Sequence, residues 1–188
     1  MVLLRPVLLY VAIVLILAVA FSLACGNGGS GGAAPQASKN ATPPPDANAI
    51  RQVELSKDPA IAALMARLGG GTPARDDVVY ADLTGDLREE AIVPIASGGT
   101  LGNIAYVVLT LRDGTTASVL DRTTDRNSAG GLKVAVEDGR LIETSGEFGP
   151  EDPFCCPSVL RKTYFRWDGS KLRVDREEKV ASPSGPKH

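Results

Sequence analysis

Three Asp-Gly pairs, each placed between two runs rich in β-branched and aromatic residues, constrain the fold more than any other feature of this chain. The pairs are Asp113-Gly114, Asp138-Gly139 and Asp168-Gly169. An Asp-Gly pair supplies the positive φ angles that a tight hairpin turn requires. Because a hairpin makes its two strands run in opposite directions, the sequence predicts three antiparallel strand pairs.

The expected strands extend beyond these hairpins. We predict seven or eight strands, drawn from the runs 77–81, 90–95, 104–111, 115–120, 132–137, 140–144, 159–167 and 171–175. The run 104–111 is the most apolar and is typical of a central strand. Alternation places Leu132, Val134 and Val136 on one face of their strand, which we expect to be buried.

One helix is expected before the strands. Asp58 is a suitable N-cap, and Pro59 suits the first helical position. An apolar stripe at helical spacing follows, made of Ile61, Leu64, Met65 and Leu68. We therefore expect an α+β fold that is mostly β. Its hairpins form an antiparallel sheet or a small β-sandwich, and this N-terminal helix covers an end or an edge.

The N-terminal residues follow the order of an export signal. Arg5 precedes an apolar stretch at 7–24, and Cys25 opens a segment rich in glycine, serine, alanine and proline. The junction Ala24-Cys25-Gly26 resembles that of bacterial lipoproteins, in which the cysteine after the signal is lipidated. This resemblance implies that Cys25 carries lipid chains such as palmitate. It also implies an anchor in the cell membrane, with the chain on the extracytoplasmic face.

Two other interpretations of the same residues remain open. The stretch 7–24 reaches the length of a membrane-spanning helix, at ~1.5 Å rise per residue against a ~30 Å apolar core. The residues Ser22-Leu23-Ala24 also fit an ordinary secretory cleavage site. All three interpretations place the rest of the chain outside the cytoplasm.

Composition divides the chain into four segments. A signal peptide at 1–24 precedes the lipidated cysteine and a flexible tether at 25–49. The tether has too little apolar mass to compensate for the entropy lost on ordering. A globular β-rich domain is expected at 50–180 and a disordered tail at 181–188.

The strongest candidate for a ligand site is the acidic segment 82–90, DLTGDLREE. It resembles the calcium loops of FG-GAP-type repeats. The resemblance assigns ligand positions to three acids, Asp82, Asp86 and Glu90. Thr84 stands where a second acid or amide is usual, and Leu87 replaces the glycine of the sharp turn, so calcium binding is expected to be weak. The alternative is a hairpin turn whose polar side chains bind local backbone N–H groups.

A second candidate is the adjacent pair Cys155-Cys156. In an oxidising compartment, two neighbouring cysteines can form a vicinal disulfide that rigidifies a turn. Free or buried thiols, and a redox or soft-metal role, are the alternatives. Metal sites more often use Cys-x-x-Cys spacing with further ligands, so the pair favours a structural role.

Charge and histidine content argue against several classes of function. The net charge of -2 lacks the basic footprint of a nucleic-acid-binding protein. His188 is the only histidine, which argues against Ser-His-Asp and Cys-His catalysis and against histidine-ligated zinc. A pair of acids for glycoside hydrolysis remains open among Glu143, Glu147, Glu151 and Asp152. A solvated acidic loop is the simpler interpretation of these four.

The segments 82–86, 155–158 and 164–169 together resemble uncharacterised bacterial envelope lipoproteins. We therefore expect a non-catalytic domain that binds an envelope ligand or protein. Its partners would be the membrane, through the lipid, and that ligand, with no nucleic acid and no cofactor beyond a weakly bound calcium ion. The alternative is an envelope enzyme, either an acid-pair hydrolase or a thiol-redox protein that uses Cys155 and Cys156.

Overall fold

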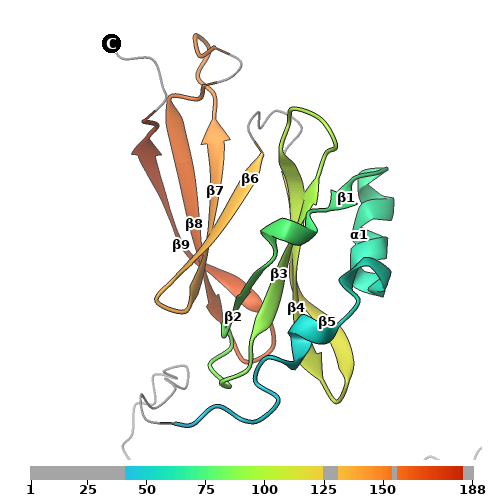
Figure 1. Ribbon diagram of the computed structural model, residues 1–188. Coiled ribbons are helices and arrows are strands. Elements are labelled where there is room, and N and C mark those ends of the chain that lie inside the picture. Colours follow the sequence, from blue (N-terminus) through green and yellow to red (C-terminus); the bar gives the residue numbers. More distant parts are fainter. Residues whose placement is uncertain (1–40, 125–130, 154–155, 184–188) are drawn as a thin grey trace, which may run out of the picture. The chain divides into compact units, whose positions relative to one another are not determined.

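Two antiparallel sheets and one α-helix form the domain in the computed structural model, which describes residues 41–124, 131–153 and 156–183 (Figure 1). The first sheet contains β1 (Thr72–Pro73), β2 (Val79–Ala81), β3 (Glu90–Ala96), β4 (Asn103–Arg112) and β5 (Thr115–Thr123). The second contains β6 (Leu132–Glu137), β7 (Arg140–Glu147), β8 (Val159–Trp167) and β9 (Leu172–Ala181). The helices are α1 (Pro59–Leu68) and the short 3-10 helices η1 (Ala49–Gln52), η2 (Leu55–Lys57) and η3 (Arg75–Asp77). The predicted α+β, mostly β fold is confirmed.

The strand order follows the hairpins. The second sheet is a simple meander, β6-β7-β8-β9, and the first has the order β1-β3-β4-β5. As its apolar sequence predicted, β4 is a central strand. Both β1 and β2 pair with β3, along the same edge and at different positions, and η3 lies between them in the chain. The two residues of β1 are too few for a sequence pattern to reveal.

Two of the three predicted tight turns are confirmed. The φ angles are 50° and 74° in Asp113-Gly114 and 50° and 71° in Asp138-Gly139, as two-residue hairpin turns require. The third connection is longer, because Trp167 lies opposite Leu172. The Asp168 carboxylate accepts hydrogen bonds from the backbone N–H groups of Ser170 and Lys171, both at 2.8 Å. The loop therefore closes around this side chain rather than at the Asp-Gly pair alone.

The helix α1 covers a face of the first sheet, which corrects the prediction that it covers an end or an edge. Its buried residues Ile61 and Leu64 belong to the same core as Val93 of β3. The neighbouring Ile92 belongs to the other core, between the sheets, and is also fully buried. Because β3 and β4 are apolar on both faces, each face needs a cover, and α1 with η1 provides one of them.

The predicted start of α1 is confirmed in detail. The Asp58 carboxylate accepts hydrogen bonds from the backbone N–H groups of Ala60 and Ile61, at 2.8 and 3.3 Å. Its other oxygen accepts a hydrogen bond from the Thr116 hydroxyl of β5. One cap therefore begins the helix and also ties it to the sheet that it covers.

The second core lies between the two sheets. Its buried members are Leu83, Ile92, Tyr106, Val108, Val119, Leu132, Leu141, Phe165 and Leu172. Val134, Val136 and Trp167 pack against them. The inward face predicted for 132–137 is therefore confirmed. Leu83 comes from the loop between β2 and β3, so this core also holds that loop in place.

We expect Gly131→Ala to destabilise the domain much more than Gly114→Ala. Both glycines have positive φ angles, 69° and 74°, so each substitution costs about 1–2 kcal/mol of backbone strain. A Cβ at Gly131 would also lie 2.6 Å from the backbone oxygen of Leu101, whereas no atom lies within 4 Å of a Cβ at Gly114. Chemical unfolding should show a loss of roughly 3 kcal/mol or more for the first variant only. Equal losses would contradict this packing.

Candidate functional site

The segment 82–90 connects β2 to β3 and is held by hydrogen bonds from its own backbone to its acidic side chains. The Asp82 carboxylate accepts from the N–H groups of Gly85 at 2.7 Å and Leu87 at 2.9 Å. Asp86 accepts from the N–H of Arg88 at 2.9 Å. These contacts are those of the turn that was the alternative to a calcium loop.

Leu87 occupies the left-handed region of the backbone, with φ of 66°. In the calcium loops that this segment resembles, a glycine stands at this position. In this structure the leucine adopts the backbone conformation of the sharp turn in its place. A side chain in this region costs about 1–2 kcal/mol, and the hydrogen bond from Leu87 to Asp82 helps to hold it there. Such strained positions persist only where the surrounding structure holds them, and they cluster at functional sites.

Glu90 is fully buried where the loop enters β3. Its carboxylate accepts hydrogen bonds from the backbone N–H of Leu83 at 2.8 Å and from the Thr110 hydroxyl at 3.0 Å. The Thr84 hydroxyl lies farther away, at 3.5 Å. Burial raises the pKa of Glu90 to about 7, although these hydrogen bonds favour the charged form. Glu90 therefore joins the loop to the central strand β4 from the inside.

The three predicted calcium ligands do not converge on a common point. Within 41–124, 131–153 and 156–183, no group of three or more His, Cys, Asp or Glu side chains could hold a metal ion. The oxygens of Asp82 and Glu90 already accept hydrogen bonds from their own loop, so coordination would have to displace these bonds. Calcium binding by Asp82, Asp86 and Glu90 remains a prediction.

A groove of about 440 Å³ opens beside this loop. Its walls come from the chain before η1, from the loop, and from the end of the β4–β5 hairpin. The lining residues are Asp46, Ala47, Ile50, Asp86, Arg88, Glu89, Leu111, Arg112, Asp113 and Gly114. Four carboxylates and two guanidinium groups therefore line the groove, together with a few apolar residues such as Ile50 and Leu111.

Ion pairs neutralise part of this charge. Arg88 binds Asp46, with its Nε 3.2 Å from the carboxylate, and Glu89 receives two hydrogen bonds from Arg51, at 2.6 and 2.7 Å. Each of these ion pairs lowers the pKa of its acid. They also fasten the chain before η1 and η1 itself to the loop. The backbone N–H of Glu89 donates to the carbonyl of Ala47 at 2.8 Å and extends the same attachment.

Asp86 and Asp113 face the groove from different walls and, within the part of the chain that the structure describes, form no ion pair. Arg112 lies beside Asp113, and its guanidinium carbon is 5.7 Å from the ring centre of Trp167. The groove therefore presents two acids without a cationic partner and one cation stacked on an aromatic ring. A ligand with a positive group matches this arrangement.

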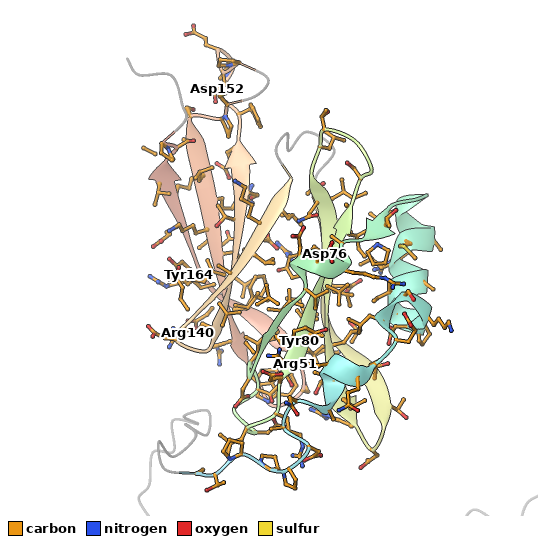
Figure 2. All side chains as sticks on the ribbon, in the orientation of Figure 1. Arg51, Asp76, Tyr80, Arg140, Asp152 and Tyr164 are labelled. Atoms are coloured by element: carbon orange, nitrogen blue, oxygen red, sulfur yellow. The ribbon has the colours of Figure 1, made fainter. Side chains whose placement is uncertain are left out.

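A smaller hollow of about 240 Å³ lies near β2, between η2 and η3. Tyr80 and Val93 contribute to its lining, with Glu54 and Arg75 among the polar residues around it. The guanidinium of Arg51 covers the Tyr80 ring at 4.7 Å, and Figure 2 shows the two side chains together. Because Glu54 and Arg75 form an ion pair at 3.5 Å, the hollow offers fewer unused polar groups than the larger groove.

Glu143 corrects the interpretation of its neighbourhood as a solvated acidic loop. It is a buried residue of β7, and its carboxylate accepts two hydrogen bonds from Arg122, at 2.9 and 3.0 Å, and one from the Tyr106 hydroxyl at 2.9 Å. The pKa of Tyr106 is raised, mainly by burial. The pKa of Arg122 is also raised, mainly by its hydrogen bonds to Glu143. This network joins the two sheets across their core.

Sequence reasoning did not find this network, although one signal was present. Glu143 is two residues from the inward-facing Leu141, so strand alternation places it on the buried face. Its partners Tyr106 and Arg122 belong to β4 and β5 of the other sheet, and only the folded chain brings them together.

Two of the other predicted acids, Glu147 and Asp152, are held by basic side chains or backbone groups. Glu147 lies 2.6 Å from both the Nε of Arg161 and the Nζ of Lys179, and its pKa is lowered, chiefly by the hydrogen bond to Lys179. Asp152 accepts from the backbone N–H groups of Gly149 and Ser158, both at 2.7 Å. Glu151 is exposed.

The cysteine predictions are only partly covered by the described residues. Cys156 is disulfide-bonded, while Cys155 and Cys25 lie outside those residues. The hydrogen bonds of Asp152 connect the two ends of the segment that contains the pair. The vicinal disulfide and the lipidation of Cys25 remain predictions.

Comparison with protein families, with curated proteins and with solved structures found no match to this chain. Among the residues that the structure describes, no helix is long and apolar enough to cross a membrane, and the stretch 7–24 lies outside them.

We expect the free energy of unfolding to fall as the pH rises from 4.5 to 7, because of Glu90. Its pKa in the folded domain, about 7, exceeds the ordinary value of 4.5. The native state therefore holds a proton that the unfolded chain has released, and a rise in pH destabilises it by up to about 3 kcal/mol over this window. Urea unfolding across this pH range measures the slope.

The variant Glu90→Gln should remove this slope. Glu89→Gln is the matched control, because its neighbouring carboxylate is paired with Arg51 and has a lowered pKa, so its titration lies below this window. A wild-type slope retained in Glu90→Gln would assign the pH dependence to another group.

Proposed function

We propose that this protein is a membrane-anchored extracytoplasmic lipoprotein whose β-rich domain binds a ligand or partner and does not catalyse a reaction. The N-terminal pattern that ends at Cys25 supports the anchor. The observation that carries the binding function is the groove beside the loop 82–90. The envelope location and the absence of catalysis are part of the proposal.

The groove has the properties of a pre-organised binding site. Its loop is held by the hydrogen bonds of Asp82 and by the buried Glu90, and the opposite wall is a tight two-residue turn. Walls that are already ordered lose little entropy when a ligand binds. The unpaired acids Asp86 and Asp113 favour a ligand that carries a positive group, such as a lysine-rich peptide segment or an amine.

The chemistry of the acids supports binding rather than acid-pair hydrolysis. Glu90 has the raised pKa of a general acid, but it is fully buried and cannot contact a substrate. Glu143 is buried against Arg122, and the pKa of Glu147 is lowered by Lys179, which disfavours proton donation near neutral pH. These environments suit structural acids better than a catalytic pair.

The groove is tested with the variant Asp113→Asn, using trilysine, trialanine and triglutamate as probes in NMR titrations of the amide signals. We expect trilysine alone to shift the signals of 85–88 and 113–114, and Asp113→Asn to weaken its binding about fivefold, the effect of losing roughly 1 kcal/mol. Asparagine also suits this kind of turn, so the hairpin is retained.

Asp138→Asn is the matched control for this titration, because Asp138 has the same φ of 50° in the other two-residue Asp-Gly turn but does not line the groove. Trilysine shifts confined to other residues, or an equal loss of binding in both variants, would contradict a cation-binding groove at Asp113.

The anchor is tested separately with Cys25→Ser. We expect the wild-type protein to incorporate labelled palmitate in a bacterial host and to fractionate with the membrane. The variant should lose the label and either accumulate unprocessed or be released, with no change in the melting temperature of the domain. An unprocessed, unlabelled wild-type protein that stays in the membrane fraction would instead favour a membrane helix at 7–24.

A further inference from the structure

The outer face of the second sheet, turned away from the first sheet, gathers positive charge. Leu141 and Phe165 pack into the core between the sheets, so their strand neighbours point to the other side. Figure 2 shows Arg140 and Tyr164 on that side. The cations of this surface, called here the basic face, are Lys133, Arg140, Lys162, Arg166, Arg173 and Arg176.

The basic face carries a net positive charge on a chain that is negative as a whole. Four acids belong to it or border it: Glu137, Asp168, Asp175 and Glu178. Six cations against four acids leave +2, so the remainder of the chain, whose total is -2, carries -4. The small net charge of the whole sequence therefore hides a positive surface on the second sheet and a negative remainder.

The ion pairs of this face leave several cations available. Asp175 is shared between Arg140 and Arg166, whose nitrogens lie 3.6 and 3.3 Å from it. Among the described residues, Lys133 and Lys162 form no ion pair. The arginine side chains of the basic face are more than half exposed, with 58% of both the Arg140 and the Arg166 side chains accessible. Exposed pairs of this kind exchange partners at little cost.

The face is a continuous sheet surface. It is formed by four neighbouring strands that lie ~4.8 Å apart. Its central aromatic residue is covered, because the guanidinium of Arg176 lies 3.8 Å from the ring centre of Tyr164. Single-stranded nucleic acid is bound through exposed aromatic rings, which this face does not offer.

We propose that the basic face docks on an anionic lipid surface. Lipid phosphates lie at a spacing that lateral diffusion adjusts, so cations spread over a sheet surface can bind them without a shaped pocket. Each cation near such a surface contributes about fivefold in affinity. Because ion pairs already neutralise several cations of this face, the total affinity from charge is small. The proposed N-terminal anchor would act as a second attachment and strengthen docking by this face. The inference is independent of the groove and of its ligand.

The test uses the full-length protein with vesicles of phosphatidylcholine alone or with one third phosphatidylglycerol, and an amine-acylating reagent read by mass spectrometry. We expect Lys133 and Lys162 to react roughly threefold more slowly on the anionic vesicles, with the protection lost at high salt. Lys57, an exposed residue of η2 on the opposite layer, is the internal control and should react equally on both.

Arg166→Ala should reduce the protection of Lys162. Arg75→Ala is the matched control, because both arginines are exposed and each forms one long ion pair, at 3.3 Å with Asp175 and at 3.5 Å with Glu54. Equal reactivity of Lys133 and Lys162 on both vesicles would overturn the proposal, and so would protection of the same size by soluble polyphosphate.

Co-sedimentation separates this proposal from that of the anchor. If the protein binds neither vesicle, both proposals fail. If it binds the anionic vesicles only, the anchor fails, but docking is supported provided that Arg166→Ala weakens the binding about fivefold. If it binds both vesicles without lysine protection, the anchor stands and docking fails.

Discussion

Burial of the strands β3 and β4 on both faces is the constraint on which the rest of this structure depends. Neighbouring residues such as Ile92 and Val93, or Val107 and Val108, belong to different cores, so the sheet must be covered twice. The helix α1 and η1 cover one face, and the meander β6–β9 covers the other. The cover that includes η1 is joined to the loop 82–90 by the hydrogen bonds of Arg51 to Glu89, and the groove forms beside this contact.

Two buried carboxylates show how this doubly covered sheet accommodates charge. Glu143 lies between the sheets and is compensated by a guanidinium and a phenol from the opposite sheet. Among the described residues, Glu90 has no cationic partner and accepts hydrogen bonds from backbone and hydroxyl donors, so burial raises its pKa. The first therefore stabilises the sandwich as an ion pair, whereas the second makes the attachment of the loop 82–90 sensitive to pH.

The distribution of charge connects this architecture with function. Unpaired acids gather where the β2–β3 loop meets the β4–β5 hairpin, and cations gather on the outer face of the second sheet. Sheet alternation contributes to this separation, since the strand neighbours of Leu141, Phe165 and Leu172 point outward and include Arg140, Arg166 and Arg173. If both proposals hold, the basic face meets the membrane and the groove binds a cationic ligand, each by electrostatic complementarity.

Local patterns in the sequence determined the hairpins, the helix with its Asp58 cap, the inward face of β6 and the mostly β class, because each depends on residues close together in the chain. Two predictions about the fold were wrong because they depend on more than a local pattern. The helix α1 covers a sheet face that only the assembled sheet exposes, and the third turn is longer because the Asp168 side chain binds its backbone.

The loop 82–90 was found from its acids, but only the tertiary structure decided that they bind their own backbone. The tertiary structure also decided that Tyr106, Arg122 and Glu143 meet and that a groove opens beside the loop. Long-range strand pairing brings these groups together, and no short-range pattern encodes it.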